Sequence, residues 1–130
     1  MAQILVIDDD SYVRDMLVEV LEPEGFSVLT AANGRKGMEL QRETPCELVI
    51  TDLFMPEQEG LETIQQLRQE FPDTKIIAIS GGTPKLPIDF LPIAETLGAD
   101  LTIAKPFRRK ELLDAIQAAK PGIIPDHAAD

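Results

Sequence analysis

Five short runs of mainly aliphatic and β-branched residues alternate with helical patterns along the chain. The runs cover Gln3–Ile7, Phe26–Ala31, Leu48–Thr51, Ile76–Ile79 and Leu101–Ala104. Such alternation is typical of βαβ units, whose strands form a parallel sheet. Three of the runs are continuously apolar, as expected for strands that helices cover on both faces. The pattern predicts an α/β fold with a doubly wound, five-stranded parallel sheet and helices on both faces.

Amphipathic patterns between these runs predict five helices. The first has an apolar stripe from Val13 to Leu21, with Ser11 placed to cap its N-terminus. The second is expected over Gly34–Glu43, after Asn33. Apolar residues at helical spacing mark the other three: Leu61, Ile64, Leu67 and Phe71, then Phe90, Ile93, Ala94 and Leu97, then Leu112, Leu113, Ile116 and Ala119.

Length and composition favour one folded domain. A chain of 130 residues with 44% hydrophobic and 27% charged residues can bury a single core. We expect that domain to cover residues 1–120. Residues 121–130 hold two prolines, a glycine and the only histidine, so we expect a flexible C-terminal tail.

The charge balance restricts the partners of the chain. A net charge of -11 repels phosphate backbones and anionic lipid headgroups, so we expect no direct contact with nucleic acid or membrane. No apolar stretch is long enough to span a bilayer. The single cysteine, Cys46, has no internal partner for a disulfide, which favours a cytoplasmic location.

Polar residues follow four of the five predicted strands. They are Asp8, Asp9 and Asp10 after the first, Asp52 after the third, Ser80 after the fourth and Lys105 after the fifth. Taken singly, each has an ordinary structural explanation: Asp10 or Ser11 as a helix cap, Ser80 as a turn residue, Lys105 as a surface charge. In open α/β sheets, however, functional residues lie beyond the carboxyl ends of the strands. The set therefore predicts one functional site at that edge.

Several carboxylates at one edge require a counter-charge. At about 4 Å, two carboxylates repel by roughly 4 kcal/mol when the effective dielectric constant is about 20. All-oxygen ligands without His or Cys nearby favour Mg²⁺, which also accepts phosphate oxygens. With Asp52 as the nucleophile towards phosphorus, Mg²⁺, Lys105 and the Ser80 hydroxyl would each neutralise one phosphoryl oxygen. The residues predict a phosphate-accepting magnesium site.

These residues, in this order, resemble the receiver domain of two-component response regulators, which has a flavodoxin-like, CheY-like fold. The resemblance covers this chain from Gln3 to Lys120. The resemblance is carried by ILVIDDD at 4–10, TDLFMP at 51–56 with Gly60, Ser80-Gly81 and KPF at 105–107. It implies a phosphorelay in which a histidine kinase or histidine phosphotransfer protein phosphorylates Asp52, switching the surface that binds a downstream protein. It also implies a phosphoacceptor that is not an enzyme, yet catalyses its own Mg²⁺-dependent phosphorylation and dephosphorylation.

The resemblance further implies roles for individual residues. Asp8, Asp9, Asp52 and the Phe54 carbonyl would hold Mg²⁺, with Asp8 acting through water. Ser80 would turn towards the phosphoryl group, and Lys105–Pro106 would be a cis peptide.

Two positions depart from the family pattern. Receivers commonly carry a switch aromatic in the fifth strand, where this chain has Thr102, so we expect smaller repacking at Thr102 and more signalling through the loop Ser80–Phe90. Phe54 offers no polar group to position an attacking water, which predicts slow self-dephosphorylation.

Two alternatives remain open at this point. In a haloacid-dehalogenase-like phosphatase, Asp8-Asp9-Asp10 would supply an Asp-x-Asp motif and Asp8 would be the modified residue. The other alternative is an inert receiver that serves only as a binding module. Nucleotide-binding folds are disfavoured, because the chain lacks both G-x-x-x-x-G-K-[ST] and a G-x-G-x-x-G turn after its first strand.

Overall fold

A computed structural model describes residues 3–53, 59–81 and 91–123 of the chain. In chain order the elements are β1 (Gln3–Ile7), α1 (Ser11–Leu21), the 3₁₀ turn η1 (Glu22–Glu24), β2 (Ser27–Ala31), α2 (Gly34–Glu43), β3 (Leu48–Asp52), α3 (Glu59–Glu70), β4 (Lys75–Gly81), α4 (Leu91–Leu97), β5 (Leu101–Lys105) and α5 (Arg109–Ala119). Strands and helices alternate as the sequence pattern predicts.

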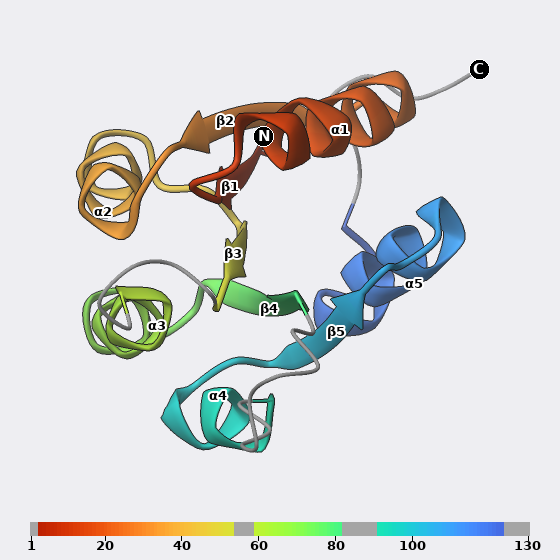
Figure 1. Cartoon of the computed structure of the whole chain (residues 1–130). Helices are drawn as coiled ribbons and strands as arrows, with labels where there is room; N and C mark the ends of the chain where they lie inside the picture. The colour runs from red at the N-terminus through yellow and green to blue at the C-terminus, as the bar shows by residue number, and fades with distance from the viewer. Residues whose placement is uncertain (1–2, 54–58, 82–90, 124–130) are drawn as a thin grey trace.

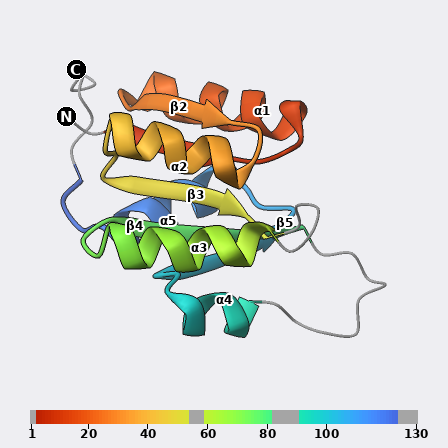
Figure 2. The same ribbon diagram turned by 90° about the vertical axis from the view of Figure 1, so that its left-hand side faces the viewer.

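The strands form one five-stranded sheet in the order β2-β1-β3-β4-β5, and every neighbouring pair is parallel. Helices α1 and α5 lie on one face of the sheet, while α2, α3 and α4 cover the other (Figure 1, Figure 2). The prediction of a doubly wound parallel sheet is confirmed.

Alternating side chains of the central strands divide the core in two. Ile4 and Val6 of β1 pack in a cluster with Leu17 of α1 and Ile116 of α5. Leu5 and Ile7 of the same strand point to the opposite face, into a cluster with Met38 of α2, Ile64 and Leu67 of α3 and Ala94 of α4. Because both faces are buried, β1 and β3 are held rigidly and their carboxyl ends have fixed positions.

The element boundaries agree with the sequence patterns to within one or two residues at most strand ends. Of the two candidate caps of α1, Asp10 and not the favoured Ser11 is the N-cap, and its side chain accepts a hydrogen bond from the Tyr12 amide. An ionised carboxylate is a stronger acceptor there than a hydroxyl, and it also complements the helix dipole. Asn33 caps α2 as expected, through the Lys36 amide. Phe90, expected in the fourth helix, lies outside the described residues.

The chain after α5 begins with an ordered contact. Ile123 is buried and belongs to the core cluster on the α1 and α5 face. Residues 124–130 of the expected flexible tail lie outside the described residues, so the tail stays a prediction. None of the helices in the described ranges has the length and apolar character needed to cross a membrane.

Arg68 joins α3 to the α3–β4 and α4–β5 connections, at the end of the sheet opposite to the polar strand ends. Its guanidinium donates hydrogen bonds to the carbonyl oxygens of Gly98 (2.7 Å), Pro72 (2.8 Å) and Thr74 (3.0 Å). It also pairs with the Asp100 carboxylate at 2.7 Å, and the Asp100 side chain in turn accepts a bond from the amide of β4. The arginine therefore closes the start of β4 and β5 against α3.

We expect Arg68→Met to lower the free energy of unfolding by about 2–3 kcal/mol, because three carbonyl groups and one carboxylate lose their donor together. Urea denaturation measures this change. Arg35→Met is the control, since the Arg35 side chain is 89% exposed and its pair with Glu39 is long, at 3.7 Å. Equal stability losses in the two variants would contradict the role assigned to Arg68.

Candidate functional site

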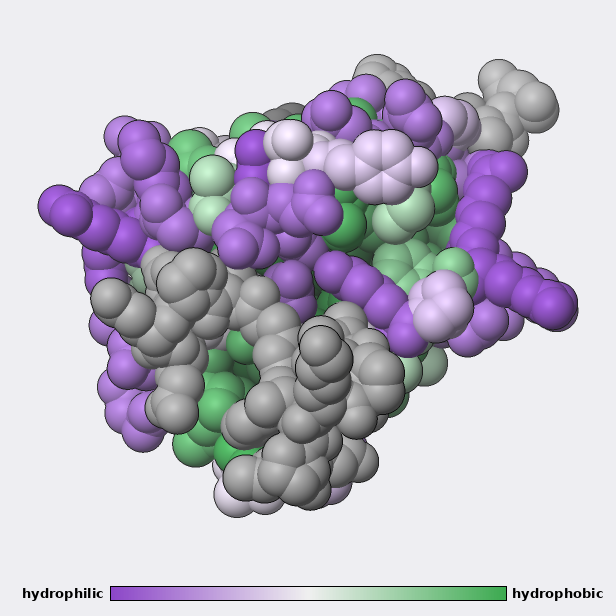
Figure 3. Space-filling view, in the orientation of Figure 1, coloured by the Kyte–Doolittle hydropathy of each residue, from purple (hydrophilic) through white to green (hydrophobic). Residues whose placement is uncertain are grey.

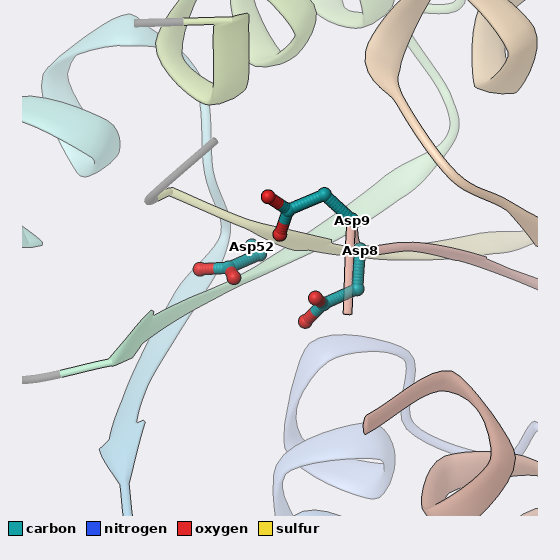
Figure 4. Close-up of side chains that lie close together, drawn as sticks. All are labelled: Asp8, Asp9 and Asp52. Carbon is teal, nitrogen blue, oxygen red and sulfur yellow. The ribbon is translucent and has the colours of Figure 1, made fainter. Parts of the chain in front are cut away.

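The acidic residues that follow β1 and β3 converge at one point. Ile7 of β1 is the register partner of Thr51 of β3, so Asp8 and Asp52 leave neighbouring strands side by side. One carboxylate oxygen from each of Asp8, Asp9 and Asp52 lies within 4.8 Å of the others. Figure 4 shows the three carboxylates turned towards a common space. The predicted meeting of these acids is observed, while their role as metal ligands stays a prediction.

Asp8 is held from every side. It is 1% exposed, its amide donates to the Ala31 carbonyl at 3.1 Å, and one carboxylate oxygen accepts a 2.9 Å bond from the Asp10 amide. The other oxygen lies 3.5 Å from the Lys105 Nζ atom. The backbone carbonyl of Asp8 accepts a 2.6 Å bond from Arg14 Nη1. The orientation of the Asp8 carboxylate is therefore fixed by the protein.

Lys105 supplies a cation to the cluster from a different strand. It is the last residue of β5, and its Nζ atom lies 3.5 Å from a carboxylate oxygen of Asp8 and 3.5 Å from one of Asp52. One ammonium group against three carboxylates leaves the cluster with an excess of negative charge. The Lys105–Pro106 peptide bond is cis, as the resemblance implied.

The two expected switch residues are placed on adjacent strands. Ser80 is 8% exposed and lies in β4 opposite Ala104, one residue beyond the β4 partner of Asp52. Thr102 is half-buried in β5 opposite Ala78. Their roles in switching stay predictions. Phe54 and most of the loop Ser80–Phe90 lie outside the described residues.

Two neighbours of the cluster have other tasks. The Asp10 side chain caps α1, so the third acid of the first run is not part of the group of three. Arg14 was not predicted from the sequence, because nothing local distinguishes it from an ordinary charge on a helix surface. Its position six residues after Asp8, in the first turn of α1, is the only signal that the guanidinium could reach back to the strand end.

The donor set fits a hard divalent cation. Mg²⁺ takes oxygen ligands at about 2.0–2.1 Å, so ligands on opposite sides of the ion are about 4.2 Å apart. The 4.8 Å limit among the three oxygens is close to that span. No sulfur or imidazole belongs to the group, which disfavours zinc. Asp8, Asp9 and Asp52 could therefore hold Mg²⁺.

The only cysteine lies away from this chemistry. Cys46 precedes β3, at the end of the strand opposite to Asp52, and is buried. Burial raises the pKa of its thiol to about 11, because the thiolate would lose its hydration. Cys46 is therefore protonated at neutral pH and is a poor nucleophile.

Figure 3 looks onto the carboxyl-end edge of the sheet. Hydrophilic residues gather near the centre of this face, between the helices on the two sides of the sheet. Asp9 is exposed there, while Asp8 and Asp52 are only 1% and 5% exposed. The site thus combines one exposed acid with two buried ones.

Comparisons with known proteins agree on one family. The family model described as "Response regulator receiver domain" matches residues 4–117. The chain is 34% identical over 118 residues to the transcriptional regulatory protein CpxR of Escherichia coli, covering 91% of this chain and 49% of CpxR. It is 32% identical to the response regulator receiver protein CpdR of Brucella abortus, covering 90% of this chain and 95% of CpdR. The chain spans about half the length of CpxR and of most other curated relatives that it matches.

A solved structure shows the same fold. The crystal structure of response regulator protein TrrA from Thermotoga maritima, in complex with Mg²⁺-BeF, superimposes with a TM-score of 0.80 at 30% identity. The match covers 92% of this chain and 99% of TrrA.

These matches correct one expectation. We expected a domain that is not an enzyme and yet catalyses its own phosphorylation and dephosphorylation, and these two statements conflict. The matched proteins are response regulators, whose receiver domains are phosphoacceptors in two-component signalling. A carboxylate that is itself modified is consumed once per event rather than turned over. The description that stands is a phosphoaccepting signalling domain, without the claim of self-catalysis.

We expect Asp9→Asn to raise the free energy of unfolding by up to about 1 kcal/mol in metal-free buffer, because it removes one of three mutually repelling carboxylates. Asp114→Asn on α5 is the control, since Asp114 is exposed and is not part of the cluster. Urea denaturation in the presence of EDTA measures both. A lower free energy of unfolding in Asp9→Asn would show that repulsion among the three carboxylates does not destabilise the metal-free protein.

Proposed function

Because the chain belongs to the family of response regulator receiver domains, we propose that Asp52 is the residue that accepts the phosphoryl group in two-component signalling. The donor would be a histidine kinase or a histidine phosphotransfer protein, and the receiver domain would cover residues 1–120. The observation that carries this proposal is the position of Asp52 between the acidic pair Asp8-Asp9 and the Lys105 ammonium group.

The surroundings favour Asp52 over the other two acids. Both carboxylate oxygens of Asp8 have partners, the Asp10 amide on one side and Lys105 on the other. Asp9 is exposed and has no ion pair within the described residues. Asp52 is 5% exposed at the end of a rigid central strand, with a cation 3.5 Å away to offset the charge that a phosphoryl group brings. Because Lys105 lies equally near Asp8 and Asp52, it is the partners already bound to both Asp8 oxygens that disfavour the phosphatase alternative, in which Asp8 would be modified.

Asp8, Asp9 and Asp52 would hold Mg²⁺, with the Phe54 carbonyl as the ligand that lies outside the described residues. When bound, the ion would neutralise the excess charge of the cluster and of the incoming phosphoryl oxygens. The similarity to TrrA, whose structure is of a complex with Mg²⁺-BeF, supports Mg²⁺ as the cation.

The protein's own groups would complete the site. Lys105 would pair with one phosphoryl oxygen, and the Ser80 hydroxyl would donate a hydrogen bond to another. Movement of Ser80, with repacking around Thr102 in the neighbouring strand, would change the surface that a downstream protein recognises. We place these partners and this domain in the cytoplasm, in keeping with one free, buried cysteine.

Incubation with acetyl phosphate and Mg²⁺ tests the acceptor. We expect intact-mass measurement to show one added phosphoryl group on the parent chain and none on Asp52→Asn, because the amide lacks the nucleophilic oxygen. Asp114→Asn is the matched control and should be modified like the parent. Modification of Asp8 in place of Asp52 would refute the proposal in favour of the phosphatase alternative, and no modification of the parent would favour an inert receiver.

A further inference from the structure

Gly60 lies in a position where its lack of a side chain needs an explanation. It is buried in the first turn of α3, and a glycine inside a helix costs about 1 kcal/mol relative to alanine. Among the described glycines, those with positive φ are Gly25, Gly98 and Gly122, so Gly60 does not require a left-handed backbone. Conformation alone does not account for glycine here.

Close approach accounts for it. A Cβ atom on Gly60 would lie 2.5 Å from the Asp52 carbonyl oxygen and 2.7 Å from both the Cα and the carbonyl oxygen of Leu53. All three are backbone atoms, which cannot rotate away. At Gly37, by contrast, a Cβ atom would meet only side-chain atoms, Cδ1 of Ile7 at 2.3 Å and Cγ1 of Ile7 at 2.7 Å. Gly60 thus allows α3 to touch the backbone of the proposed phosphoacceptor.

The same peptide is held from its other side. The Leu53 amide donates a 2.9 Å hydrogen bond to the Ile79 carbonyl of β4, and the Leu53 side chain is 5% exposed within the core. The chain leaving Asp52 is therefore clamped between β4 and the start of α3. Both contacts act on the backbone, so together they determine where the Asp52 Cα atom, and hence its carboxylate, can lie.

We propose that Gly60 is a positioning residue for the phosphoacceptor: its bare backbone lets α3 press on the Asp52–Leu53 peptide and sets the Asp52 carboxylate against Asp8 and Asp9. The inference rests on the proposed function. An alanine would force a separation of about half an ångström, since real Cβ atoms do not come within 3.0 Å of such neighbours. Binding sites tolerate displacements of only about that size.

Mg²⁺ titration followed by NMR chemical shifts tests this inference on four proteins: the parent, Gly60→Ala, Gly37→Ala and Arg68→Met. We expect Gly60→Ala to bind Mg²⁺ at least about fivefold more weakly than the parent. Gly37→Ala is the control for crowding, because it presses on a side chain only. Arg68→Met is the control for lost stability far from the site. The Mg²⁺ affinities of both controls should stay within about twofold of that of the parent, because neither substitution moves the backbone of Asp52.

Hydrogen exchange gives a second measurement. We expect the Leu53 amide to exchange faster in Gly60→Ala than in either control, relative to the Ile50 amide within the same strand, because one side of the clamp is displaced. If Gly60→Ala is unfolded in buffer, all four proteins are compared in trimethylamine N-oxide, which favours the compact state.

The possible results separate two failures. If the parent itself does not bind Mg²⁺, the proposed function fails. If the parent and Gly60→Ala bind Mg²⁺ equally well, the positioning role of Gly60 is wrong while the proposed function stands. The same conclusion follows if the Mg²⁺ affinity of all three variants falls in proportion to their loss of stability.

Discussion

Repulsion among three carboxylates is the constraint on which this structure depends. Asp8, Asp9 and Asp52 place oxygens within 4.8 Å of one another, and a flexible chain would separate them. They stay together because Asp8 directly follows β1 and Asp52 is the last residue of β3, and the side chains of both strands are almost completely buried. Burial of β1 and β3 between two helical layers thus supplies the free energy that holds the charges together. The packing of the core therefore determines the geometry of the site.

The helices around the site act on backbone as well as on side chains. Arg14 of α1 holds the carbonyl of Asp8, while the Asp10 carboxylate caps the same helix. On the opposite face of the sheet, Gly60 brings α3 against the carbonyl of Asp52. Each of the two buried acids is therefore fixed by a helix from a different layer. A displacement of either strand end would therefore change its contact with the helix that packs against it.

The sequence allowed much of this arrangement to be predicted, for a physical reason. Strand and helix periodicities report burial, and the carboxyl ends of parallel strands must share an edge, so Asp8, Asp52 and Lys105 could be brought together without coordinates. The sequence favoured Ser11 over Asp10 as the cap of α1, and the choice failed because the two residues are adjacent and both are good caps. The roles of Arg14 and Gly60 were missed. Both depend on distances between elements, and local patterns carry no information about those distances.

The charges at the site are held with unequal stiffness. Asp8 and Asp52 lie at the ends of central strands and are nearly inaccessible, whereas Lys105 ends the edge strand β5 and its side chain is 24% exposed. Every residue of β5 is at least partly exposed, in contrast to β3. A four-carbon stem on an edge strand can also change rotamer at little cost. A new negative charge on Asp52 would therefore be answered by movement of Lys105 and β5 rather than of the acids. Thr102 lies on the same strand, so a response to such a charge would begin in the part of the sheet that resists displacement least.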